Sequence, residues 1–149
     1  MSTREFYNHI LPEVAMTQQT INTDTTTAGE IIDTAKYDGG VMFVIFSGTL
    51  TDGTYTPLLQ DGDNSALSDA AAVADAQIVP VNVAGTWYET GQEAAIAFAA
   101  TDDDTVKAIA VTGTKRYVRL SLVSASTSSG GVIGAIALKK GELQSVYGA

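Results

Sequence analysis

Apolar residues recur along most of the chain in short runs separated by turn-forming residues. Eight of these runs from residue 29 onward are long enough to be strands: 29–33, 41–47, 55–60, 77–83, 94–99, 105–111, 115–124 and 131–139. Short strands with frequent Gly or Asp breaks are typical of two packed sheets rather than of alternating strands and helices. The pattern predicts an all-β protein with a single β-sandwich or jelly-roll-like domain of about eight short strands.

The clearest strand signals lie in residues 105–139, which read as three consecutive strands separated by two Gly-containing turns. Within 117–123, alternate residues form one apolar set and one mixed set, which is the pattern of a half-buried strand. We expect the apolar set to face the core (Val118, Leu120 and Leu122) and the other set to face outward (Tyr117, Arg119 and Ser121).

Four further stretches carry local signals. Residues 41–46, VMFVIF, are apolar on both faces and predict a central, buried strand. Asp52-Gly53 lies between two apolar runs and is typical of a β-hairpin turn, where Gly supplies a positive φ. Residues 61–76 fit either a short Ala-rich helix or a long loop, and 94–99 predicts a strand although its Ala content also favours helix.

Residues 1–28 differ from the rest of the chain. Pro12 interrupts any long helix there, and the Thr-rich sequence after it offers little to bury. We therefore expect residues 1–28 to form an extended N-terminal arm that lies along a neighbouring molecule, and residues 29–149 to form the sandwich domain.

The chain is acidic overall, with a formal net charge of −9, but the charge is unevenly distributed. Residues 1–104 hold 2 basic and 16 acidic side chains, whereas residues 105–149 hold 6 basic and 1 acidic. This asymmetry suits docking in a fixed orientation, although strands that simply carry Lys and Arg on their solvent face would produce it too. Charged residues make up only 17% of the chain, which favours a protein with part of its surface covered by partners.

Several classes of chemistry are disfavoured. The chain has no cysteine, and its one histidine (His9) lies in the expected arm. The segment 61–65 begins like an EF-hand calcium loop, but positions 66 and 72, where such a loop requires Gly and Glu, are both Ala. Residues 102–104, DDD, read as a solvated acidic turn, and no glycine motif has the spacing of a phosphate-binding loop. We expect no enzyme, no cofactor and no metal site. No apolar run is long enough to span a membrane, and no signal peptide is recognisable.

The segment 115–119, KRYVR, pairs basic side chains with an aromatic one, as nucleic-acid sites do. With a sequence pI near 4.3, we expect no nucleic-acid binding. Arg116 and Arg119 instead predict ion pairs with carboxylates of a neighbouring subunit, and pairing within the chain explains them equally well.

Three segments in this order and spacing resemble small proteins of tailed bacteriophages that decorate or cement the capsid. They are 37–41 (YDGGV), 50–57 (LTDGTYTP) and 115–120 (KRYVRL). The resemblance implies a virion protein of the capsid surface, made in the host cytoplasm, that binds the major capsid protein and forms homo-oligomers, with a trimer favoured. The candidate interface residues are Phe6, Tyr7, Ile10, Leu11, Arg116, Tyr117 and Arg119.

Two alternatives stay open. A carbohydrate- or receptor-binding module would stack sugar rings on Trp87, Tyr88 and Tyr55 in loops. A tail or head–tail connector component would share the same fold class and lack of catalytic residues, but would differ in its copy number per particle.

Overall fold

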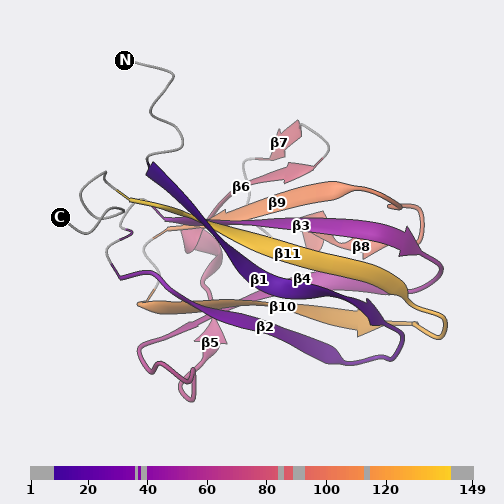
Figure 1. Cartoon of the computed structure of the whole chain (residues 1–149), viewed down its shortest axis with the longest axis horizontal. Helices are drawn as coiled ribbons and strands as arrows, with labels where there is room; N and C mark the ends of the chain where they lie inside the picture. Colours follow the sequence, from indigo (N-terminus) through magenta and orange to yellow (C-terminus); the bar gives the residue numbers. More distant parts are fainter. Residues whose placement is uncertain are drawn as a thin grey trace.

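The computed structural model describes residues 9–35, 37, 40–83, 86–88, 93–112 and 115–141, with the backbone alone for 79–83 and 86–88. Two antiparallel sheets pack against each other (Figure 1). The strands of sheet A are, in spatial order, β1 (Ile10–Ile21), β11 (Gly131–Lys140), β3 (Val41–Leu50), β9 (Val106–Val111), β6 (Ile78–Val83) and β7 (Thr86–Tyr88). Those of sheet B are β2 (Thr26–Asp33), β10 (Tyr117–Ala125), β4 (Thr54–Gly62) and β5 (Ala71–Ala72), and β8 (Phe98–Ala99) also pairs with β4.

The strand order is that of a jelly roll. Four antiparallel pairs are nested along the chain, because β1 pairs with β11, β2 with β10, β3 with β9, and β4 with β5. Strands β11 and β10 then join the outer pairs to the inner ones, at β3 and β4 respectively. This double Greek key confirms the predicted all-β sandwich of jelly-roll type.

The core lies between the sheets and is built from alternate residues of the facing strands. Phe43 and Ile45 of β3 are fully buried, as is Ile109 of β9. From the opposite sheet, β10 contributes the predicted core face, with Val118, Leu120 and Leu122 each 0% exposed. The period-two pattern in residues 117–123 therefore identified the core side of β10 correctly.

The expected N-terminal arm is wrong for the part of it that the structure describes. Residues 10–21 form β1, which pairs with β11 from Ile10 to Ile21 and buries Ala15, Met16 and Ile21. The sequence pattern hid this strand because the register shifts on either side of Met16, so two consecutive residues are buried and the alternation breaks. Pro12 is tolerated because β1 is an edge strand. The predicted boundary at residue 28 falls inside β2, and the sandwich begins by residue 10.

The Asp52-Gly53 turn does not close a β-hairpin. Its flanking strands lie in different sheets, since β3 pairs with β11 and β9 whereas β4 pairs with β10. Gly53 does adopt the positive φ that the dipeptide suggests, at +85°. The same Asp-Gly signal therefore occurs here in a turn that connects the two sheets. The local sequence pattern does not distinguish such a connection from a β-hairpin.

The two ambiguous stretches are mostly irregular. Residues 63–70 form turns before the two-residue strand β5, so the loop interpretation of 61–76 is the correct one. The strand predicted over 94–99 is largely wrong, because a 3-10 turn covers Glu93–Ile96 and only Phe98 and Ala99 pair with β4. Ile96 and Phe98 are nevertheless fully buried, so these residues close the core without being a long strand.

Candidate interaction surface

The outer face of sheet A carries three rows of uncharged residues that run across the strands. Residues that alternate with the core positions point to this face, and the cross-strand register aligns them. The first row is Pro12, Leu138, Met42 and Ala110; the second is Val14, Ile136, Val44 and Ala108; the third is Gly134, Phe46 and Val106. No described residue in these rows has an ionisable side chain.

Most of these outer-face residues keep contact with solvent, although Ala108 and Gly134 are buried. Met42, Val44, Phe46, Ile136 and Leu138 are half-buried, in contrast to Phe43 and Ile45 on the core side of the same strand, which are 0% exposed. Val14 and Val106 are each 53% exposed. Polar residues adjoin the rows only at their ends, where Gln18 of β1 lies beside Gly134 and Asn82 of β6 pairs opposite Ala108. A sheet with one solvated face normally alternates apolar and polar residues, so a face with three rows that carry no charge and are apolar on β3 and β11 is a candidate contact surface.

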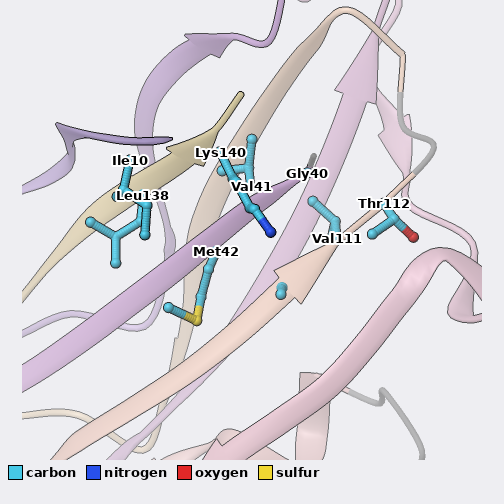
Figure 2. Close-up of a pocket in the computed structure, with 9 residues that line it drawn as sticks. Ile10, Gly40, Val41, Met42, Val111, Thr112, Leu138 and Lys140 are labelled. Carbon is cyan, nitrogen blue, oxygen red and sulfur yellow. The ribbon is translucent and has the colours of Figure 1, made fainter. Parts of the chain in front are cut away.

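A hollow of about 220 Å³ opens at the end of this face where β1 begins and β11 ends. Side chains and backbone of β1, β3, β9 and β11 line it, as Figure 2 shows. Its apolar lining includes Ile10, Met42, Ala110 and Leu138, and Lys140 is the one charged residue among the described residues at its margin. The hollow is suited to an apolar side chain from a partner rather than to a polar ligand.

Arg116, Tyr117 and Arg119 are engaged within the chain. The Arg116 guanidinium forms two hydrogen bonds to the Asp33 carboxylate, at 3.0 and 2.9 Å, and lies 5.0 Å from the centre of the Tyr117 ring. Arg119 donates to Gln60 Oε1 at 2.9 Å. The interpretation of these arginines as intramolecular partners is therefore confirmed for Arg116, while Arg119 pairs with an amide instead of a carboxylate.

The structure describes two of the four N-terminal candidate interface residues, Ile10 and Leu11. Ile10 lines the hollow and Leu11 is 37% exposed, so both lie at the surface of the sandwich. Phe6 and Tyr7 lie outside the described residues. Sequence reasoning missed the larger set on β3 and β11 (Met42, Val44, Phe46, Ile136 and Leu138), although the two-faced apolar run at 41–46 was the signal that could have indicated it.

Two carboxylates hold the turn between β10 and β11. Asp52 accepts hydrogen bonds from the backbone amides of Ser128, Ser129 and Gly130 and from the Ser128 hydroxyl. The Ser128 hydroxyl, followed by the amides of Ser129 and Gly130, holds the pKa of Asp52 well below its usual value. Asp24 accepts from the amide and hydroxyl of Thr127, which lowers its pKa in the same way.

Two of the three side chains in the acidic turn at 102–104 form contacts within the chain, whereas the sequence predicted a solvated turn. Asp102 pairs with the buried Lys107 at 3.1 Å and accepts from the Ala99 amide, and Asp103 accepts from the Leu50 amide. Burial raises the pKa of Asp102, but the hydrogen bonds from Ala99 and Lys107 outweigh it and lower the value overall. Asp104 stays exposed, with a positive φ of 49°.

Acid is expected to destabilise the fold through these carboxylates. The hydrogen bonds from Arg116 lower the pKa of Asp33 from 3.8 to about 2. A carboxylate with a lower pKa in the folded state stabilises the fold above the unfolded pKa and loses that contribution as the pH falls through the folded one. We therefore expect the free energy of unfolding, measured with urea, to drop between pH 4 and pH 2. Asp52→Asn should reduce that drop, and Glu30→Gln, a change at an exposed site on β2, should leave it unchanged.

The expected absence of catalytic and metal chemistry stays a prediction. Among the described residues, no group of three or more His, Cys, Asp or Glu side chains is placed to hold a metal ion. His9 Nδ1 lies 3.2 Å from the Gly141 carbonyl oxygen. Within the part of the chain that the structure covers, no helix has the length and apolar character to cross a bilayer.

The sugar-stacking alternative loses one of its three aromatics. Tyr55 is 0% exposed and its hydroxyl donates to the carbonyl oxygens of Asp52 and Ile21. The side chains of Trp87 and Tyr88 lie outside the described residues. Tyr55 is therefore a core residue and cannot stack on a ligand.

No protein-family model matches the chain, and no curated protein is similar to it in sequence. Among solved structures, the chain is similar to the crystal structure of the SPBc2 prophage-derived protein YomS, with a TM-score of 0.48 and 9% sequence identity. That similarity covers 87% of this chain and 94% of the other.

Proposed function

We propose that the protein is a structural component of a tailed-phage virion that decorates and stabilises the capsid shell, bound to the major capsid protein and to its own copies. The observation that carries this proposal is the outer face of sheet A, where three uncharged rows keep solvent exposure on a central part of the sheet. A face of this kind gains free energy when a partner covers it, because apolar surface leaves water.

The rest of the molecule agrees with a role in assembly. Jelly rolls recur among viral capsid proteins, although the fold alone does not decide the function. The hollow beside Met42 offers a socket for an apolar side chain, and the arginines that could have bound a ligand are engaged within the chain. Many such contacts over a shell stabilise it through multivalency even if each one is modest.

The position and copy number of the protein in purified particles test the proposal. We expect the protein on the capsid surface in many copies, seen by cryo-electron microscopy and quantitative mass spectrometry. Particles that lack it should release DNA at a lower temperature, and added purified protein should restore their heat resistance. A few copies at the neck or tail would indicate a connector or tail component instead, and particles whose heat resistance does not depend on the protein would contradict decoration.

A further inference from the structure

We propose that the outer face of sheet A is the contact between two copies of this chain, related by a two-fold axis that crosses β3 at Val44. The pairing deepens one part of the proposed function, the binding of the protein to its own copies, and rests on the same face. Two copies would nevertheless associate in solution whether or not the protein is part of a virion. Four observations support it: the chemistry of the face, the symmetry of its rows about Val44, the complementary relief at its two ends, and the charges beside them.

The chemistry of the face selects an identical face as its partner. The outer face of sheet B is different, because its central strand presents Tyr117 and Arg119, with Asp33 and Gln60 opposite them. Among the described residues, the surface that matches an uncharged, largely apolar sheet face is therefore the same face of another copy. Two faces of this kind pack as the sheets of a sandwich do, and contact between identical patches is closed by a two-fold axis.

The rows are arranged symmetrically about Val44. The row of Met42 lies on one side of the row of Val44 and the row of Phe46 lies on the other, each two residues away. A two-fold axis across the strands at Val44 reverses the strand direction of the second copy and keeps its strand order. The Met42 end of one copy then faces the Phe46 end of the other.

The two ends of the face are complementary in shape. The Met42 end is hollowed, with Ala110 of β9 in the lining, whereas Val106 at the other end of β9 is 53% exposed. The proposed axis places Val106 of each copy over the hollow of the other. Figure 2 shows the hollow with Leu138 and Ile10 on one side and Val111 and Thr112 on the other.

The charges beside the face are also complementary. Lys140 is exposed at the hollow end and donates its backbone N–H to the Gly40 carbonyl oxygen, whereas Asp104 is exposed at the other end and donates its backbone N–H to the Gly48 carbonyl oxygen. Gly40 and Gly48 are each four residues from Val44, so the same axis brings Lys140 of one copy to the end of the face where the second copy's Asp104 lies. Lys140 lies on the β11 side of β3 and Asp104 on its β9 side, so these opposite charges share one end of the paired faces about two strand spacings apart. At that distance they offset part of the repulsion between copies that each carry a net charge of −9.

This geometry predicts a pair of chains instead of the trimer that the phage resemblance favours. In sedimentation equilibrium, the wild-type protein should have twice the monomer mass of 15.5 kDa. Val106→Asp should raise the dissociation constant at least about tenfold, because it places a carboxylate in an apolar contact. Val123→Asp is the matched control, since Val123 is also exposed, at 38%, but lies on β10 in sheet B. It should leave the pairing unchanged.

The pairing is contradicted if the wild-type protein sediments as a monomer or a trimer, or if folded Val106→Asp protein stays paired. It is equally contradicted if Val123→Asp dissociates the pair to the same degree. Circular dichroism establishes that each variant is folded before its mass is compared.

A second experiment does not depend on Val106. Lys140→Glu should weaken the pair, and adding Asp104→Asn should restore part of the affinity, because Asn keeps the positive φ at this position. The axis passes through Val44, so it places Val44 of one copy opposite Val44 of the other, at about the 10 Å spacing of packed sheets. The chain has no cysteine, so in the Val44→Cys protein a short bismaleimide cross-linker should join the two copies through this position alone.

Absence of that cross-link in a paired Val44→Cys protein would overturn the proposed axis. A confirmed pair in a protein that is missing from virions would leave this inference standing and contradict the proposed function. A protein that is a monomer in solution but is found on capsids would contradict this inference and leave the proposed function standing.

Discussion

A chain truncated to begin at Asn22 is expected to lose its cooperative unfolding transition altogether. The truncation removes β1, whose residues Ala15, Met16 and Ile21 are 0%, 2% and 4% exposed in the core. Truncation of one buried side chain such as Met16 to Ala typically costs about 2–5 kcal/mol, and a whole domain has about 5–15 kcal/mol of stability. Loss of the strand also leaves the backbone of β11 as a new sheet edge, which is prone to aggregation.

Thermal and urea unfolding followed by circular dichroism measure this effect. Met16→Ala is the graded version of the truncation and should lower the free energy of unfolding by about 2–5 kcal/mol. Thr17→Ala, in the same strand but exposed, should change it by no more than about 0.5 kcal/mol. A truncated chain that unfolds cooperatively with unchanged stability would show that residues 10–21 are an arm after all.

Replacing Gly29 by Ala is expected to lower the free energy of unfolding by about 3 kcal/mol or more. A Cβ at Gly29 would meet two backbone carbonyl oxygens, one from Ala15 of β1 and one from Leu120 of β10, closer than real Cβ contacts come. Neither oxygen belongs to a flexible side chain, so the clash can be relieved only by moving a strand. Because Ala15 lies in sheet A and Leu120 in sheet B, the movement would separate the elements that β2 holds together.

Gly48→Ala is the matched control, since the nearest atom to its added Cβ is Val132 Cβ at 3.5 Å, an ordinary van der Waals contact. A Gly→Ala change without strain stabilises by about 0.4–1 kcal/mol through the unfolded state. The two variants should therefore differ in sign in urea unfolding. Equal effects would mean that β1 and β10 do not approach Gly29 as closely as the structure shows.

Residues with regular period-two patterns revealed their structure in advance. In β10, Val118, Leu120 and Leu122 were expected in the core and are fully buried. The run 41–46 predicts a central, buried strand: β3 does lie between β11 and β9, but only alternate residues of the run are buried. The β10 prediction succeeded because alternate side chains of a strand point to opposite faces whatever the neighbouring strands are.

Other features depended on long-range contacts. The bulges around Met16 break the alternation of β1, so a strand with three buried residues read as a polar arm. The Asp-Gly turn after β3 leads into the other sheet, because β3 pairs with β9 and β11 whereas β4 pairs with β10, and all three of these partners come much later in the chain. The Ala-rich segment at 94–99 has weak local preference, and its conformation follows from the burial of Ile96 and Phe98.

For the outer face of sheet A too, the sequence indicated one part of the result and the tertiary structure decided the other. Apolar residues on both faces of 41–46 are visible in the sequence and predict burial on both sides. The tertiary structure decided otherwise: one face of β3 packs on sheet B, while the other aligns with Leu138, Ile136 and Val14 into uncharged rows that stay partly exposed. The sequence by itself determined the all-β class and the core faces of its regular strands, because these depend on local alternation. Register and sheet order decided which strands meet and where apolar side chains gather outside the core, because those depend on residues far apart in the chain.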